Sequence, residues 1–340
     1  MTGDPSRRDF LRLGGAALAT AGFSPLLTRP SAAASPTNIE IVDTGHGTNA
    51  TFLRALADNG VKTIFRYYAQ ENNIPGKNIT PNERAMIHDH GLSLAIVYQH
   101  QAWRQNRFSR ATGIEDASFC LERAIEIQQP QQSAIFFGVD SDTHTDAAVI
   151  EYLTAVKSVL GRYFEIGCYG SGAHCKAAID AGVATLSWVA EAPAWGGTRD
   201  FINSGRWTLY QNKTQIERSP HMSAGGVPID TNVLHPNYTS IGAFDRQGYR
   251  VSYDPVRVLL NYQRRMFVSA TQLNVREHPG GRVVSHLCIA RTVHVLGIDD
   301  GWAMVDTNED GRADGYVSAE YLRPLHEMPA YVRGCMPEAL

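Results

Sequence analysis

The sequence has little of what marks several common protein classes. It holds five cysteines in 340 residues, an odd number whose spacing fits no zinc-binding pattern. Its 31 basic and 34 acidic residues leave a net charge of -3, which argues against nucleic acid as a partner. No predicted strand is followed by G-x-G-x-x-G and no G-x-S-x-G occurs, so a Rossmann-type dehydrogenase and an α/β-type serine hydrolase are both disfavoured.

The N-terminal apolar stretch is too short to be a membrane anchor. Leu13–Leu27 falls below the ~20 residues of a spanning helix and contains Pro25. Arg7 and Arg8 precede it in SRRDFLR, and the small residues SAAA, 31–34, follow it. This order is typical of a twin-arginine (Tat) signal, which exports folded proteins. We therefore expect residues 1–34 to be removed by the export machinery. The mature protein would be periplasmic, wall-associated or secreted, with no membrane anchor.

Ordinary globular composition, with 43% hydrophobic and 19% charged residues, supplies a sizeable core. Residues 38–235 alternate strand-like and helix-like segments, which predicts a parallel sheet covered by helices. Eight strands favour an irregular (β/α)8 TIM barrel with its last helices short or missing. The predicted strands are Ile39–Thr44, Thr63–Tyr68, Leu92–Gln99, Ala134–Asp140, Phe164–Tyr169, Thr185–Ala190, Trp207–Gln211 and Val227–Val233. The predicted helices are Asn49–Asn59, Pro81–His90, Ile114–Gln128, Ala147–Leu160, His174–Ala181 and Arg199–Asn203.

The character of the chain changes after the barrel segment. Residues 236–265 are poorly patterned and are predicted to be a linker. Residues 266–325 contain short β-like runs separated by Gly- and Asp-rich turns, which predicts a small all-β domain.

Acidic residues follow the fourth predicted strand in AIFFGVDSDTH. Side chains two apart share one face of a strand, so Asp140 and Asp142 are predicted to point inward together with Gly138. The carboxyl ends of barrel strands are where barrel enzymes place their chemistry.

Other predicted strands also end in polar or aromatic side chains. If the barrel closes, these side chains form one pit, acidic at its floor and aromatic at its wall. That composition suits a sugar, because carboxylates act as acid, base or cation stabiliser in glycosidic cleavage and aromatic rings offer flat apolar faces. The candidate substrate-binding residues are Asp43, Arg66, Tyr67, Tyr98, Tyr169, Trp188, Gln211 and Asp230.

The order and spacing of these motifs resemble a glycoside-hydrolase-like barrel family of unknown function, related to the family 25 muramidases. The resemblance covers about residues 38–235 and implies action on peptidoglycan or another cell-wall polysaccharide, without a cofactor. Carried over from the muramidase Asp-x-Glu pattern, Asp142 takes the general-acid position and Asp140 the assisting one. This sequence departs from the pattern, since Asp142 is one methylene shorter than Glu and proton transfer requires close approach.

The small β domain resembles a bacterial SH3 domain. The matching elements are Asn274-Val275-Arg276, Gly301-Trp302, Gly315-Tyr316-Val317 and Tyr321-Leu322. The resemblance implies binding of cell-wall peptides, which would hold the barrel near its polymer. Simple packing of the domain on the barrel is the alternative.

Two possible metal sites and one possible disulfide stay open at this point. Asp306, Asn308, Asp310 and Asp314 have part of the spacing of a calcium loop, but the twelfth position is Val317, and an acidic hairpin turn is favoured. A metal site of Asp140, Asp142, His144 and Asp146 is a weak alternative. Cys168 and Cys175 could pair after export, although buried thiols are favoured.

The sequence thus supports two functions. The first is an exported, muramidase-like glycoside hydrolase that cleaves cell-wall glycan. The second is a non-catalytic carbohydrate-binding protein with a degenerate active site.

Overall fold

The computed structural model describes residues 40–70, 74–102, 104, 106–213, 227–307 and 313–328. The predicted signal segment, 1–34, lies outside them. Among the helices of the described residues, none combines the length and apolarity needed to cross a bilayer.

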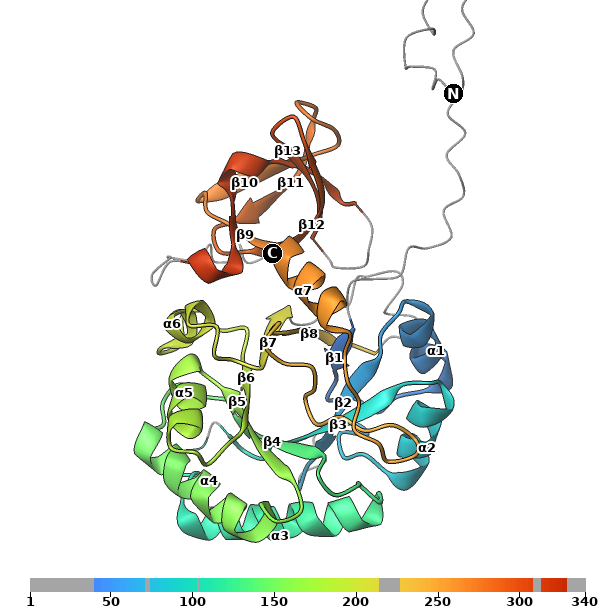
Figure 1. The fold of residues 1–340 in the computed structure, drawn as a ribbon, viewed down its shortest axis with the longest axis vertical. Helices are drawn as coiled ribbons and strands as arrows, with labels where there is room; N and C mark the ends of the chain where they lie inside the picture. The colour runs from blue at the N-terminus through green and yellow to red at the C-terminus, as the bar shows by residue number, and fades with distance from the viewer. Residues whose placement is uncertain are drawn as a thin grey trace, which may run out of the picture. The chain divides into compact units, whose positions relative to one another are not determined.

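Within the described residues, eight strands close into a barrel with consecutive neighbours in sequence order, which confirms the predicted barrel (Figure 1). Its strands are β1 (Ile41–Asp43), β2 (Thr63–Tyr68), β3 (Ser93–Tyr98), β4 (Ala134–Val139), β5 (Glu165–Gly170), β6 (Leu186–Val189), β7 (Leu209–Lys213) and β8 (Asp230–Leu234). The pairs from β1 to β7 are parallel, whereas β8 pairs antiparallel with both β7 and β1. The prediction of a wholly parallel sheet was therefore wrong for the last strand.

Helices surround the barrel strands (Figure 1). They are α1 (Ala50–Asp58), α2 (Pro81–Asp89), α3 (Arg110–Glu126), α4 (Asp146–Leu160), α5 (Gly172–Asp180) and α6 (Thr198–Asn203). The first five begin where a side-chain oxygen of the preceding residue accepts a backbone N–H, as Thr80 does for Glu83 at α2. The last of them, α6, spans only six residues, and residues 214–226, between β7 and β8, lie outside the described part.

Alternation along the strands divides the core into two layers. One set of side chains packs outward against the helices, and the other fills the barrel interior, with Phe65, Phe136 and Trp188 at its centre. Gly167 is required there, because a Cβ at this position would lie 2.3 Å from the Phe136 ring. The interior is therefore packed, and only the rims are open to chemistry.

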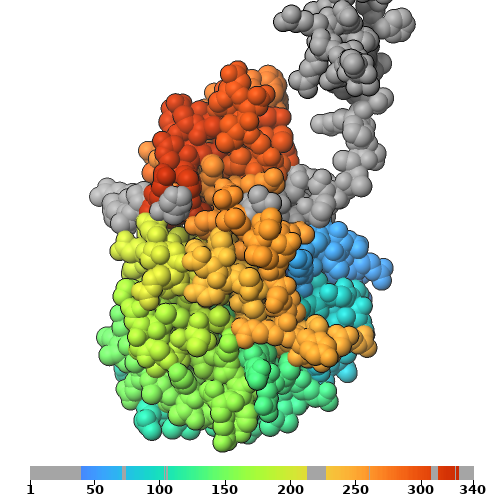
Figure 2. All heavy atoms as spheres, viewed as in Figure 1, coloured from blue at the N-terminus to red at the C-terminus, as the bar shows by residue number. Residues whose placement is uncertain are grey.

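Residues 236–254, in the segment predicted as a linker, close one end of the barrel. Ile241 and Ala243 join the interior core, and Tyr253 places its hydroxyl 2.6 Å from Thr63 Oγ1. The carbonyl of Gly242 accepts the amide of Ala134, the first residue of β4, at 2.9 Å. Figure 2 shows this segment, in yellow to orange, spread over the barrel face turned toward the viewer. The closed end is thus the one where strands β2 to β5 begin, which leaves the opposite rim as the candidate site.

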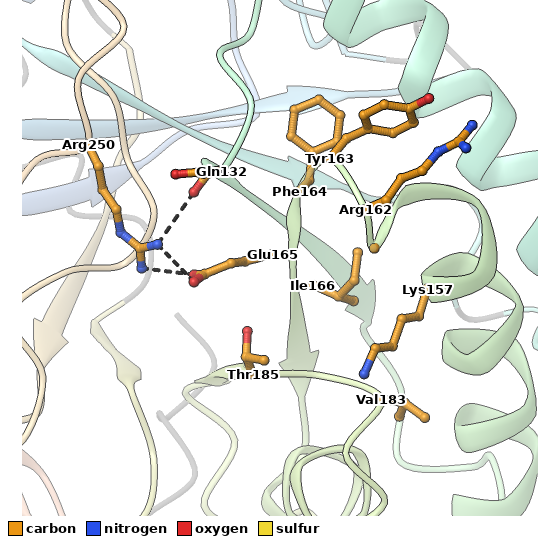
Figure 3. A pocket seen from close by; sticks show the side chains of 11 residues that line it. Gln132, Lys157, Arg162, Tyr163, Phe164, Glu165, Ile166, Val183, Thr185 and Arg250 are labelled. Atoms are coloured by element: carbon orange, nitrogen blue, oxygen red, sulfur yellow. Dashed lines mark hydrogen bonds and ion pairs between the residues drawn. The ribbon is translucent and has the colours of Figure 1, made fainter.

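A pocket of about 300 Å3 lies at the closed end, at the start of β5 (Figure 3). There the Arg250 guanidinium pairs with the Glu165 carboxylate at 2.8 Å and donates to the Gln132 carbonyl. These contacts fasten the closing segment to β5, and we assign this pocket a structural role.

Residues 265–324 form the small β domain. Its strands are β9 (Arg265–Val268), β10 (Gln272–Arg276), β11 (Val283–Cys288), β12 (Thr292–Asp299), β13 (Trp302–Asp306), β14 (Gly315–Ser318) and β15 (Leu322–Pro324). In the part of the domain that the structure describes, they form one antiparallel sheet in the order β11-β10-β14-β13-β12-β9-β15. This confirms a small all-β domain after the barrel. Helix α7 (Pro255–Arg264), which the sequence reading missed, precedes it.

The candidate calcium loop is only partly described. Asn308 and Asp310 lie outside the described residues. Asp314 Oδ2 accepts hydrogen bonds from the Thr307 amide and hydroxyl, both at 2.6 Å. Across the described part of the chain, no group of three or more His, Cys, Asp or Glu side chains is placed to hold a metal ion.

Candidate active site

Two carboxylates face each other at the open rim. Asp43 is the last residue of β1 and Asp230 is the first residue of β8, and the two are direct partners in the antiparallel register. The sequence reading placed Asp230 at the end of its strand. It begins the strand instead, but because β8 runs in reverse, Asp230 reaches the same rim.

Asp43 is almost completely enclosed, with 1% of its surface exposed. Asn232 Nδ2 donates to its Oδ2 at 2.8 Å, and the hydroxyl of Tyr67 lies 3.4 Å from Oδ1. Gln211 Nε2 lies 3.3 Å from Asp43 Oδ2 and 3.2 Å from Asp230 Oδ2. One amide therefore bridges the two carboxylates and holds them in a fixed relation.

Burial and charge act together on this pair. Burial, and then the charge of Asp230, raise the pKa of Asp43 well above its ordinary value, against the hydrogen bonds from Asn232, Gln211 and Tyr67. Burial also raises the pKa of Tyr67 and Tyr169, and the charges of Asp43, Asp140 and Asp230 all add to that rise. All three carboxylates are thus close enough to the two phenols to act on them.

This coupling predicts a pH-dependent stability that one substitution removes. Because the pKa of Asp43 is raised in the folded state, the folded protein binds more protons, and its stability falls as pH rises above the ordinary Asp value near 3.9. Asp43→Asn should remove this loss. Above the ordinary pKa of Asp, the difference in the free energy of unfolding between the variant and the wild type should then increase by up to about 1.4 kcal/mol for each pH unit. Urea unfolding between pH 4 and 7 measures this, with Asp58→Asn, an exposed carboxylate of α1, as the control. A difference that does not change with pH would contradict the coupling.

Asp140 lies at the same rim, directly after the end of β4. Gln99 Nε2 donates to its Oδ2 at 2.9 Å, and Lys77 Nζ donates to Gln99 Oε1 at 3.3 Å. Burial raises the pKa of Asp140, and the Gln99 hydrogen bond and the Lys77 charge oppose that rise. Gln99 covers Gly138, where an added Cβ would lie 3.1 Å from Gln99 Cγ. The space above Gly138 is therefore filled by the Gln99 side chain.

Asp142 has different neighbours from Asp140. Strand β4 ends at Val139, so the alternation that predicted a shared face does not extend to Asp142. The exposed Asp142 carboxylate accepts the Gly196 amide with both oxygens at 3.0 Å. This contact joins the β4–α4 loop to the loop between β6 and α6.

The predicted aromatic residues divide between rim and interior. Tyr169 donates its hydroxyl to Gln211 Oε1 at 2.9 Å, so it is part of the rim cluster. Trp188 is 1% exposed, packs against Phe65 and Tyr169, and donates its Nε1 to Asn232 Oδ1 at 2.7 Å. It is therefore placed to orient the Asn232 amide that holds Asp43, beneath the open rim.

Two predicted site residues lie on the outer side of the strands. Arg66 is fully buried and donates to Glu83 of α2 at 2.8 Å and to the Thr44 carbonyl. Tyr98 donates to the buried Asp116 of α3 at 2.7 Å. Both join strands to the surrounding helices.

Sequence reasoning missed two residues of the rim, Asn232 and Lys77, whereas Gln99 was predicted as the end of the strand Leu92–Gln99. Strand parity could have identified Asn232, since it is two residues after Asp230. Lys77 lies in the β2–α2 loop and is brought in by the fold, with its Nζ 5.3 Å from the Tyr67 ring centroid. No local pattern marks it.

A closed barrel with carboxylates gathered at one rim is the architecture of glycoside-hydrolase-like barrels. The chain belongs to the family described as Rv2525c-like, glycoside hydrolase-like domain, whose model matches residues 54–234.

Curated relatives include two uncharacterized proteins of Bacillus subtilis (strain 168). YbfG is 27% identical over 186 residues, covering 50% of this chain and 25% of YbfG. FadG is 28% identical over 191 residues, covering 53% of this chain and 32% of FadG. The chain therefore spans a quarter to a third of the length of these relatives. Among solved structures, the Tat-secreted protein Rv2525c of Mycobacterium tuberculosis, crystallised with L-tartrate, matches with a TM-score of 0.48 and 18% identity, covering 57% of this chain and 94% of that one.

Proposed function

We propose that this chain is an exported glycoside hydrolase that cleaves a cell-wall glycan, peptidoglycan being the expected substrate. The observation that carries the proposal is the gathering of Asp43, Asp230 and Asp140 at the open rim of a glycoside-hydrolase-like barrel. Carboxylates that differ in environment and pKa are what acid–base cleavage of a glycosidic bond requires.

Within this proposal, Asp140 is the proton donor. The residue is exposed at the rim where a glycosidic oxygen would lie, while the atoms around its carboxyl desolvate that group enough to raise its pKa. It therefore keeps a proton to higher pH than an ordinary Asp. The resemblance to muramidases points to Asp142 instead, but that carboxylate is bonded to the Gly196 amide. We therefore give Asp142 the task of holding the two rim loops together, and Asp230 that of stabilising positive charge on the sugar. The raised pKa of Asp43 favours its uncharged form, so we give Asp43 the task of positioning Gln211 and Asn232 at the rim.

The remaining parts of the chain fit an extracellular role. We propose that residues 1–34 are a Tat signal, that 38–235 carry the glycan site, and that the SH3-like domain at 266–325 tethers the barrel to the wall. A tether raises the local concentration of substrate without any change in the barrel site.

One observation favours binding without cleavage. Asp43 is enclosed by Asn232, Gln211 and Tyr67, so its carboxylate already has three partners without a substrate. If these hydrogen bonds to Asp43 persist when a sugar is bound, the rim would bind the sugar without cleaving it.

Release of reducing ends separates the two functions. The mature protein is incubated with purified peptidoglycan and, separately, with soluble chitooligosaccharides, and new reducing ends are counted over time. Reducing ends that the wild type releases and Asp140→Asn does not would support the hydrolase. Retention of the protein on peptidoglycan with no reducing ends from either substrate would replace it by the binding function.

A further inference from the structure

A second binding site lies in the small β domain. A cavity of about 610 Å3 opens on the outer face of its sheet, between the β10–β11 turn and the β12–β13 turn. It is lined by Pro279, Gly280, Gly297, Ile298, Asp299, Asp300, Trp302, Met304 and Tyr316. We call these residues the aromatic–acidic groove.

The strand register explains how apolar side chains come to face outward. Ala303, Val305 and Val317 point into the buried core of the domain. The alternate residues Trp302, Met304 and Tyr316 therefore point away from it, and Met304 and Tyr316 are direct cross-strand partners. The outer face of an antiparallel sheet is ordinarily polar, and a concave apolar patch on it marks an interaction site.

A β-bulge creates the floor of the groove. The register of β12 against β13 shifts between Val295 and Gly297, so that Gly297 lies opposite Met304 on the outer face. An added Cβ at Gly297 would meet no atom within 4 Å. The absent side chain is thus what leaves the groove open, and Ile298 beside it remains 56% exposed.

Two acidic residues line the groove together with the rings. Asp299 pairs with Trp302 across a two-residue turn whose central residues, Asp300 and Gly301, both have positive φ, at 42° and 75°. This turn brings Asp299 and Asp300 into the lining of the groove that Trp302 and Tyr316 also form. Aromatic faces next to carboxylates form an environment that attracts a cation, and an ammonium group in particular.

We propose that the aromatic–acidic groove binds a short peptide that carries an ammonium side chain. The rings of Trp302 and Tyr316 contact the aliphatic stem and the ammonium group of the peptide side chain. Asp299 and Asp300 supply the opposite charge. Because the groove belongs to the domain proposed as the wall tether, this inference names the ligand chemistry of that tether, and it rests on the proposed function only to that extent.

Calorimetric titration of the mature protein tests the proposal. The probes are the tripeptide Ac-Ala-Lys-Ala-NH2 and the same peptide with its lysine Nε-acetylated, which keeps the stem and removes the charge. We expect the acetylated peptide to bind at least about tenfold more weakly, and Trp302→Ala or the double variant Asp299→Asn/Asp300→Asn to weaken the lysine peptide by a similar factor. Gly297→Leu should abolish binding by filling the floor, whereas Val284→Leu, an exposed change on β11 outside the groove, should leave it unchanged.

Two results would overturn the proposal. Equal affinity for the two peptides would show that the charge is not recognised, and absence of heat with the lysine peptide at millimolar concentration would show that the groove does not bind it. Release of reducing ends from soluble chitooligosaccharides, measured on the same variants, does not depend on the groove. Failure of the groove and failure of the barrel function therefore remain distinguishable.

Discussion

Asp116→Ala should destabilise the barrel by about 3–5 kcal/mol, the largest stability effect that we expect from a single substitution. Asp116, 2% exposed on α3, accepts hydrogen bonds from the hydroxyls of Tyr98 and Tyr152, both at 2.7 Å. Arg107 Nη2 lies 2.5 Å from its Oδ2. Alanine would leave a buried cation and two buried hydroxyls without their acceptor, and an unpaired buried charge is what makes such a loss large.

Urea unfolding of the wild type and the variant measures this loss, and the chain offers a matched control. Asp180 also accepts two cationic donors, Lys176 at 2.6 Å and Arg206 at 2.5 Å, but all three side chains are solvent-exposed. Asp180→Ala should therefore lose far less stability, because water replaces the lost partners and screens the charges. Equal losses in the two variants would refute the importance of burial at Asp116.

The same cluster shows that Tyr98, predicted as a site residue, faces the helices, while its strand was predicted correctly. Strand-like and helix-like segments of the sequence indicated all eight barrel strands and the six helices α1 to α6, because both patterns are local. The face on which a side chain lies depends on where the strand enters the barrel. Because side chains alternate along a strand, Tyr67 at the rim requires that Arg66, its neighbour on β2, faces the helices. In the same way, Tyr98 of β3 faces the helices and Gln99, the next residue, faces inward.

Other features were beyond local reasoning. The direction of β8 is set by its pairing with β7 and β1, and nothing in Asp230–Leu234 encodes it. The prediction that Asp230 belongs to the rim survived because a reversed strand begins where a parallel one would end. Residues 236–254 close the barrel through irregular backbone contacts, such as those of Phe244 with Leu94, which leave no periodic pattern in the sequence.

The largest effect on activity is expected from Asp140→Asn, which should lower the rate of glycan cleavage by about 10²- to 10⁴-fold, the usual contribution of a general acid. Asparagine preserves the size of the side chain and its place beside Gln99 but carries no transferable proton. Asp142→Asn is the matched control, since the remaining carbonyl oxygen still accepts the Gly196 amide and the loop contact persists. We expect it to lose less than about tenfold. The reverse order, with Asp142→Asn inactive and Asp140→Asn active, would transfer the acid role to Asp142.

The pH profile supplies a readout that loss of structure would not imitate. A general acid works while protonated, so the rate falls as pH rises through its pKa. The Lys77 charge lowers the pKa of Asp140, and Lys77→Met should therefore raise that pKa and move the alkaline limb of the pH–rate profile to higher pH. Reducing-end release measured from pH 4 to 9 for wild type and Lys77→Met shows the direction of the change. A limb that stays in place, or moves to lower pH, would mean that the proton controlling cleavage is not held by Asp140.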